Sequence, residues 1–175
     1  QYHSQFISPE EEEQLLHEIK NIELHSFIFQ GYEAKRKVAS FGYDWSFEKR
    51  VLSKGKEIPE AFHWLINKAA KMLQIPFENI TELLITEYPA GSVINWHRDA
   101  PPFHTIGISL LSDCIFKLRP YDKAKQGRKS IISIPLQRRS LYIIRDAART
   151  DWEHSIAPVN QIRYSITLRT LNASG

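Results

Sequence analysis

Residues 163–169 read RYSITLR, a stretch in which polar and apolar side chains alternate along the chain. Neighbouring side chains of an extended strand point to opposite faces, so the alternation predicts a strand with one polar and one apolar face. The polar face carries Arg163, Ser165, Thr167 and Arg169. A solvated outer face is the ordinary explanation. Two arginines that bracket two hydroxyls also suit a carboxylate ligand, because a guanidinium holds a carboxylate through two parallel hydrogen bonds.

Other short stretches of mixed β-branched and aromatic residues precede this strand, separated by proline, glycine or charged turns. We expect strands at 83–88, 105–111, 114–118, 130–134, 140–145 and 162–171. Because no helical period separates them, the pattern favours an antiparallel sandwich or barrel over alternating strand–helix units.

The N-terminal third predicts two helices. Ser8 can cap the first, Pro9 suits its first turn because it needs no amide donor there, and Glu11 closes a capping box. The second is expected from about Pro59 to Leu73, with an apolar stripe facing inward. The predicted fold class is therefore α+β, with two N-terminal helices packed on one sheet.

The composition indicates one globular domain spanning residues 1–175. Of the 175 residues, 42% are hydrophobic and 25% charged, and the net charge of +3 permits an anionic partner without requiring one. No apolar run approaches the roughly 20 residues that cross a bilayer, so no membrane partner is expected. The single cysteine, Cys114, excludes an internal disulfide, and we expect a reducing intracellular compartment, cytoplasmic or nuclear. The oligomeric state, and whether a segment precedes Gln1, stay open.

The run Asn95-Trp96-His97-Arg98-Asp99 holds the first metal-binding candidates. In extended backbone His97 and Asp99 share a face, and His154 is the natural third donor. Two imidazoles and one carboxylate form the facial triad of non-haem Fe(II) oxygenases. A His-x-Asp pair alone also suits a solvated turn, and these three ligands plus water would suit Zn²⁺ in a hydrolase, which leaves the two arginines without a purpose.

Four motifs taken in order resemble the AlkB family of Fe(II)/2-oxoglutarate dioxygenases, over roughly residues 38–171. They are the run YPAG at 88–91, His97-x-Asp99, His154, and the alternating strand at 163–169. The resemblance implies that His97, Asp99 and His154 bind Fe(II).

The resemblance also implies a fold and a cosubstrate site. The family fold is a double-stranded β-helix, or jelly roll, here expected over about 83–171. In the 2-oxoglutarate site, Tyr88 and Arg163 would hold the carboxylate far from the metal, and Arg169 would lie by the nearer one with Thr167. Thr86 stands where repair members often carry asparagine, and we include it as a single hydroxyl donor.

The activity implied by the family is oxidative removal of N-alkyl groups, methyl above all, from nucleobases of DNA or RNA. The reaction consumes 2-oxoglutarate and O2 and gives succinate, CO2 and an aldehyde. The substrate is expected to be single-stranded or to present a flipped base.

The resemblance also implies a lid over the active site, at about 31–55. Aromatic residues recur there with period two, between basic residues, as single-stranded nucleic-acid binding requires; they are Phe41, Tyr43, Trp45 and Phe47. A core-packed strand explains the same pattern equally well. The resemblance implies that a flipped base stacks between a lid aromatic residue, here Tyr43 or Trp45, and His97.

Two features leave alternatives open. Pro101 stands where repair-type relatives often place an acidic residue that meets the base. The same oxygenase chemistry on a protein side chain or a small molecule, and a non-catalytic nucleic-acid-binding module, are therefore rival functions. The run QRRS at 137–140 resembles a turn of some RNA-directed relatives, although an ordinary basic turn is the favoured interpretation. DNA or RNA, the alkylated base, and repair or modification are left undecided.

Overall fold

The computed structural model describes residues 1–29, 31–46, 49–99 and 103–171. Its helices are α1 (Pro9–Lys20), α2 (His63–Leu73) and the short α3 (Ala147–Thr150). Its strands are β1 (Tyr2–His3), β2 (His25–Phe29), β3 (Tyr32–Ser46), β4 (Val51–Lys54), β5 (Ile80–Tyr88), β6 (Ile94–His97), β7 (Phe103–Leu110), β8 (Cys114–Pro120), β9 (Ile132–Leu136), β10 (Leu141–Ile144), β11 (Trp152–Ile156) and β12 (Arg163–Leu171). None of these helices is both long and apolar enough to cross a lipid bilayer.

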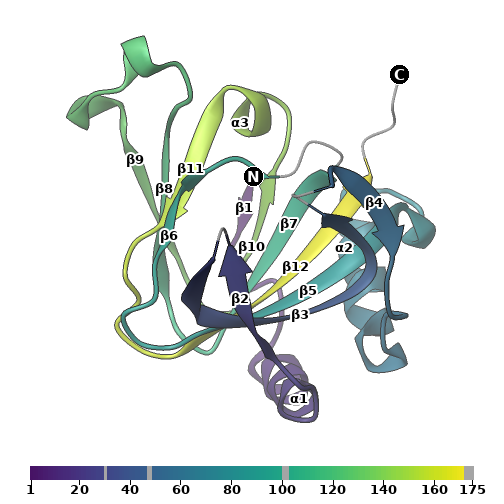
Figure 1. Ribbon diagram of the computed structural model, residues 1–175. Coiled ribbons are helices and arrows are strands. Elements are labelled where there is room, and N and C mark those ends of the chain that lie inside the picture. Colours follow the sequence, from purple (N-terminus) through teal and green to yellow (C-terminus); the bar gives the residue numbers. More distant parts are fainter. Residues whose placement is uncertain (30, 47–48, 100–102, 172–175) are drawn as a thin grey trace.

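The strands of the described residues form two antiparallel sheets (Figure 1). The large sheet has the order β1-β10-β7-β12-β5-β3-β2, with β4 paired to β3, and the small sheet has the order β6-β11-β8-β9. Because neighbours in each sheet are mostly distant in sequence, the chain crosses repeatedly between the two layers. The expected jelly-roll architecture is confirmed.

The main core lies between the helices and one face of the large sheet. Leu15 and Ile19 of α1 and Leu65 and Ile66 of α2 are buried there. They meet the apolar residues of β12, among them Ile166, which is fully buried. The predicted packing of both N-terminal helices on one sheet is therefore observed.

The opposite face of β12 points between the two sheets rather than to solvent. Arg163 is 0% exposed, Ser165 2% and Thr167 9%. This excludes the solvated-face explanation of the alternating strand. The polar side chains enter the interior of the sandwich, where a second cluster that includes Tyr88 and Phe116 borders them.

The helix starts show one confirmed and one wrong prediction. The Ser8 hydroxyl accepts a hydrogen bond from the Glu11 amide at 3.1 Å, and the Glu11 carboxylate accepts one from the Ser8 amide at 2.9 Å, so the capping box is present. The second helix begins at His63 rather than near Pro59, because the chain first makes a 3-10 turn over Glu60–Phe62.

The strand predictions also need two corrections. The strand expected at 130–134 is β9, which starts at Ile132, because Arg128–Ser130 form a 3-10 turn. Strands β1, β2 and β4 were not among the predicted strands, and the strand expected to carry the aromatic residues from Phe41 onward is the second half of β3. Strand β3 changes partner at Gly42, from β5 to β4. Gly42 has φ +85°, and a Cβ there would lie 2.2 Å from the Thr81 carbonyl oxygen, so the turn requires glycine.

The basic run at 137–140 has a structural role. Arg138 and Arg139 form ion pairs with Glu12 of α1, and the Arg138 amide donates to the Asp113 carboxylate at 2.7 Å. The turn therefore fastens α1 to the sandwich, which fits the favoured interpretation as a basic turn.

Candidate active site

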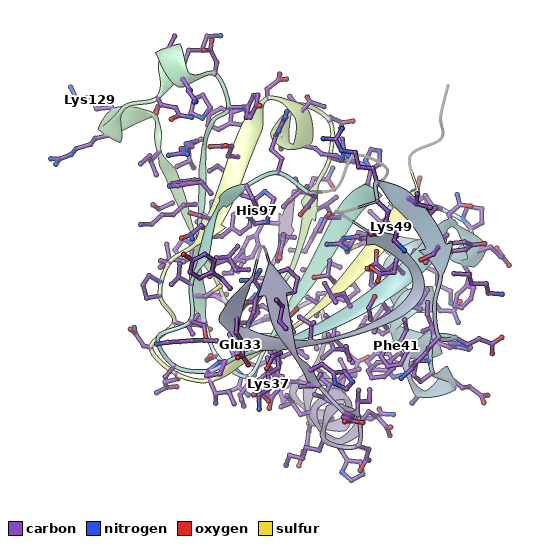
Figure 2. The ribbon with its side chains drawn as sticks, in the orientation of Figure 1. Glu33, Lys37, Phe41, Lys49, His97 and Lys129 are labelled. Carbon is purple, nitrogen blue, oxygen red and sulfur yellow. The ribbon has the colours of Figure 1, made fainter. Side chains whose placement is uncertain are left out.

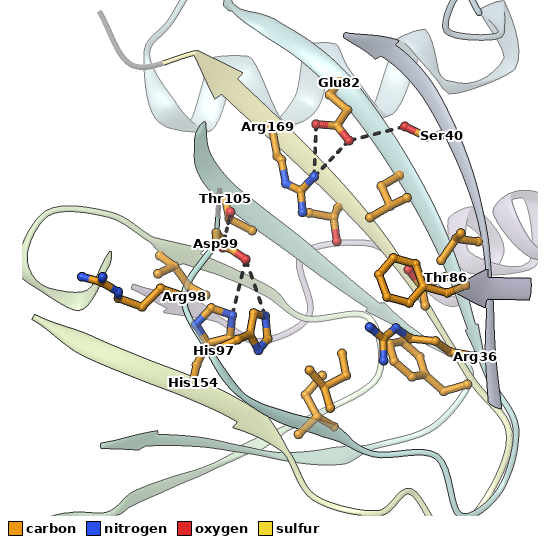
Figure 3. A pocket seen from close by; sticks show the side chains of 18 of the residues that line it. Arg36, Ser40, Glu82, Thr86, His97, Arg98, Asp99, Thr105, His154 and Arg169 are labelled. Carbon is orange, nitrogen blue, oxygen red and sulfur yellow. Dashed lines mark hydrogen bonds and ion pairs between the residues drawn. The ribbon is translucent and has the colours of Figure 1, made fainter. Parts of the chain in front are cut away.

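Two imidazoles and a carboxylate converge between the sheets. His97 ends β6 and His154 lies on β11, where the antiparallel register places the two residues directly opposite each other. Their ring centroids are 4.2 Å apart. Asp99 Oδ1 lies 3.8 Å from His97 Nε2 and 3.5 Å from His154 Nε2 (Figure 3). The candidate ligand atoms of all three residues lie within 4.8 Å of one another, so one ion can contact all three.

Neighbouring groups fix how these side chains point. His97 Nδ1 is 2.8 Å from the Asn95 carbonyl oxygen, which requires Nδ1 to carry the proton and leaves the Nε2 lone pair for a metal. Thr105 donates a hydrogen bond to Asp99 Oδ2. The His154 ring stacks on Phe116, with centroids 5.4 Å apart and an interplanar angle of 17°.

The protonation states also suit a divalent cation. Burial alone raises the pKa of the Asp99 carboxyl, but the hydrogen bond and charge of His154 hold that pKa well below its usual value. Burial, and then the neighbouring His154, lower the pKa of His97. At neutral pH the site therefore offers a carboxylate and a neutral His97 imidazole, the forms that coordinate metal.

A cavity of about 370 Å³ opens beside the triad (Figure 3). Among the residues expected to bind 2-oxoglutarate, Thr86, Tyr88, Thr167 and Arg169 line it. Strands β5 and β12 bring them together, since Tyr88 pairs with Arg163 and Thr86 with Ser165 across the two strands.

Arg163 lies behind Tyr88 and has no carboxylate partner among the described residues. Its guanidinium carbon is 5.0 Å from the centre of the Tyr88 ring. Nε donates to the Ser109 hydroxyl at 2.9 Å, but Nη1 and Nη2 are buried and make no hydrogen bond within the described residues. A buried cation with two orphaned donors is the arrangement expected where an anionic ligand completes the site.

Arg169 differs, because the protein already supplies its counter-ion. Its Nη1 lies 3.0 and 3.2 Å from the two carboxylate oxygens of Glu82, which is 1% exposed. Burial raises the pKa of Glu82, and the charge of Arg169 opposes that shift. Glu82 was not among the predicted site residues. Only the structure reveals Glu82, through the β5–β12 register that pairs it with Arg169.

The expected lid residues divide between the two faces of β3. Even-numbered residues line the cavity, namely Arg36, Val38, Ser40 and Asp44. Phe41 points away and packs against the helix-covered core, as the core-packed alternative required. Tyr43 is 38% exposed and is not among the residues that line the cavity, so its stacking role stays a prediction without support from its position. The side chain of Trp45, and Phe47 entirely, lie outside the described residues.

Phe27 of β2 is an aromatic residue that the sequence did not single out. It lines the cavity and packs beneath the Arg36 guanidinium, whose carbon lies 4.3 Å from the ring centroid. The sequence offered no signal for it, because β2 was not a predicted strand.

The donor set and the orphaned guanidinium fit Fe(II) and 2-oxoglutarate. Two imidazoles and a carboxylate match the facial triad, and the buried guanidinium of Arg163, next to the cavity-lining Tyr88, has two donors that could meet a carboxylate. A zinc hydrolase would leave the buried charge of Arg163 unexplained.

Comparison with known proteins agrees with this chemistry. A model of the 2OG-Fe(II) oxygenase superfamily matches residues 2–169, and the chain belongs to that superfamily. It is 27% identical over 156 residues to an uncharacterized protein (L905) of Acanthamoeba polyphaga mimivirus, covering 87% of this chain and 70% of that protein. It is 28% identical over 162 residues to mouse (Mus musculus) ALKBH8, a tRNA (carboxymethyluridine(34)-5-O)-methyltransferase, covering 88% of this chain but 23% of that protein.

Among solved structures, OsALKBH1 has the same fold, with a TM-score of 0.72 at 12% identity over 97% of this chain and 95% of that one. These relatives confirm the resemblance to the AlkB family. The chain is a dioxygenase that uses Fe(II), 2-oxoglutarate and O2.

Proposed function

We propose that this dioxygenase removes N-alkyl groups, methyl above all, from nucleobases in DNA or RNA. The supporting observation is the surface around the triad. A groove of about 750 Å³ adjoins the cavity and shares His97 with it. The groove is lined by cations and aromatic rings, among them Tyr32, Lys35, Arg36, Trp96 and Arg98. Aromatic faces that stack on bases, interleaved with cations that meet phosphates, suit single-stranded nucleic acid.

In this proposal His97, Asp99 and His154 hold Fe(II), which with 2-oxoglutarate and O2 supplies the oxidation of the alkyl carbon. The Asn95 carbonyl keeps the His97 Nε2 lone pair directed at the metal. Thr105 keeps the Asp99 carboxylate in place.

Arg163 and Tyr88 hold the far carboxylate of 2-oxoglutarate. Fe²⁺, the Asp99 carboxylate and doubly charged 2-oxoglutarate sum to −1, and Arg163 brings that sum to zero. Arg169 adds no net charge, because Glu82 neutralises it. Thr86 and Thr167 offer hydroxyl donors along the same wall of the cavity.

The metal-site residues lie inside the sandwich, where a base would have to enter from a single strand of nucleic acid. Figure 2 shows His97 between the two sheets, whereas Lys129 lies at the end of the projecting β8–β9 connection. We propose that residues of about 31–55 form a lid and that residues 1–175 form one dioxygenase domain. We expect it to work in a reducing cytoplasmic or nuclear compartment, where Fe(II) persists.

The name of the mouse relative includes tRNA, so single-stranded RNA loops belong in any substrate panel beside DNA.

A succinate assay tests the proposal. Purified protein with Fe(II) and ascorbate should convert 2-oxoglutarate to succinate faster when a methylated single-stranded oligonucleotide is present than with its unmethylated counterpart. The Asp99→Ala variant, which removes one metal ligand, should lose turnover while its circular dichroism spectrum is retained. If no methylated DNA or RNA stimulates turnover, the enzyme acts on a protein side chain or a small molecule instead.

A further inference from the structure

Arg36 stands at the boundary between the cavity and the groove. It lies on β3, on the face that lines the cavity, and it belongs to the lining of both spaces. Figure 3 shows its guanidinium pointing into the cavity, on the side of Thr86 and opposite the histidines. A ligand that enters from the groove towards the metal site therefore passes this side chain.

The charge of Arg36 has no carboxylate counterpart among the described residues. Its one ring contact there is Phe27, a neutral aromatic face, and no ion pair of the described residues includes it. Burial lowers the pKa of Arg36, which indicates a partly desolvated cation, although an arginine remains charged at neutral pH. A partly desolvated guanidinium forms stronger hydrogen bonds to anions than a fully solvated one does.

The acidic residues of the cavity wall do not offset this charge. Asp44 lies on the same strand, about 26 Å further on at 3.3 Å per residue, less the bend at Gly42. Its field acts on Glu82 instead. Glu82 is engaged by Arg169. The field of Tyr88 acts on Arg36, and that of Arg36 acts on His97, so Arg36 lies within electrostatic range of both residues.

The cosubstrate does not use this charge either, if the proposed site is right. Fe²⁺, Asp99, 2-oxoglutarate and Arg163 already sum to zero, and Arg169 is neutralised within the protein. The charge of Arg36 is then left for the substrate.

We propose that Arg36 binds an anionic group of the substrate at this boundary, which in a nucleic acid is the phosphate next to the target base. The inference rests on the proposed function and deepens it. It assigns to this arginine the role of selecting a substrate with a negative charge beside the reacting base. The shared chemistry is an anion–guanidinium contact, and a carboxylate of 2-oxoglutarate is the other possible source of that anion.

The test compares Arg36→Ala and Arg36→Lys with Lys37→Ala, a matched control. Lys37 is the next residue of the same strand, is exposed, and lines neither space. The first measurement is the fluorescence anisotropy of a labelled, methylated single-stranded oligonucleotide, with Fe(II) and 2-oxoglutarate present and O2 excluded. The second is 2-oxoglutarate affinity by intrinsic fluorescence. Thermal melts of all variants check folding.

Arg36→Ala should weaken oligonucleotide binding about tenfold, as expected for loss of one charge-assisted contact, while Lys37→Ala stays within about twofold. The slope of log affinity against log salt should fall by about 0.7, the value for one phosphate on a single strand. Arg36→Lys should lie between, because lysine keeps the charge and loses the planar fork. The affinity for 2-oxoglutarate should stay unchanged.

Two results would overturn the inference. Equal oligonucleotide affinity in Arg36→Ala and Lys37→Ala would make Arg36 a packing partner of Phe27 only. A tenfold loss of 2-oxoglutarate affinity with unchanged oligonucleotide binding would assign Arg36 to the cosubstrate. Because binding is read without turnover, a wild-type protein that binds the oligonucleotide and does not dealkylate it contradicts the proposed function alone.

Discussion

The two ends of β12 present the same side chain in opposite settings. Arg163 is fully buried, and two of its nitrogens find no hydrogen-bond partner within the described residues. Arg169, six residues along the strand, is held by the buried carboxylate of Glu82. An unpaired buried cation opposes folding, whereas a paired one is largely compensated. Under the proposed function, the unpaired Arg163 is available to an anionic ligand, whereas the charge of Arg169 is already compensated within the protein.

The largest expected effect is the loss of 2-oxoglutarate affinity when the unpaired Arg163 is replaced. Arg163→Met should lower 2-oxoglutarate affinity by about 100-fold or more, since the carboxylate loses its buried cationic partner. The free energy of unfolding without ligand should stay the same or rise by about 1 kcal/mol, because a buried charge is replaced by an apolar side chain. Ligand titration and urea denaturation measure the two quantities. A methionine variant that binds 2-oxoglutarate normally would contradict the assignment.

Removing the ion pair between Arg169 and Glu82 should chiefly lower the stability of the fold. Glu82→Gln removes the carboxylate and leaves Arg169 mostly buried with an uncompensated charge, which should lower the free energy of unfolding by about 3 kcal/mol. Urea denaturation provides the measurement. The double variant Glu82→Gln/Arg169→Met is the control and should recover much of the loss. If Glu82→Gln is as stable as the wild type, the pair is not the structural element described here.

Arg138 is a third paired or unpaired arginine to compare, and it is more exposed than Arg163 and Arg169. Arg138 is paired with Glu12, whose carboxylate also accepts a hydrogen bond from the Leu111 amide at 3.0 Å. Burial raises the pKa of Glu12. The hydrogen bond from Arg138 and the other partners together lower the pKa by more than burial raises it, so the pKa lies below its usual value. Because the folded-state pKa is depressed, the stabilisation is complete above the unfolded-state value of about 4.3 and is lost as the pH falls through the folded-state pKa.

Glu12→Gln should therefore lower the free energy of unfolding by about 1 kcal/mol at pH 7, less than at Glu82 because Arg138 is partly exposed. Its stability should fall less steeply than that of the wild type as the pH drops below about 4.3. Denaturation at a series of pH values tests both points. Parallel stability curves for the two proteins would show that Glu12 does not titrate with folding.

Local patterns predicted much of the fold. The Ser8 capping box depends on residues three apart, and the alternation at 163–169 depends on neighbours, so both are visible in the sequence. The triad was predicted because a His-x-Asp pair and a later histidine suit one known chemistry. The structure brings all three together.

The pairing of Arg169 was not predicted, because its partner lies 87 residues away and only the β5–β12 register brings the two together. The face of β3 that lines the cavity was also missed. The aromatic pattern at odd positions predicted that those residues face the substrate, but the strand presents its even-numbered residues to the cavity. Which face of a strand points inward depends on the partner strand and on the change of partner at Gly42, and neither is local.

The placement of His97 and His154 on opposed strands has a mechanical consequence. β6 is the outermost strand of the small sheet and pairs only with β11 within the described residues. A metal ion coordinated by both imidazoles would cross-link these two strands. Metal binding would therefore also reduce the mobility of β6 at the edge of the substrate entrance.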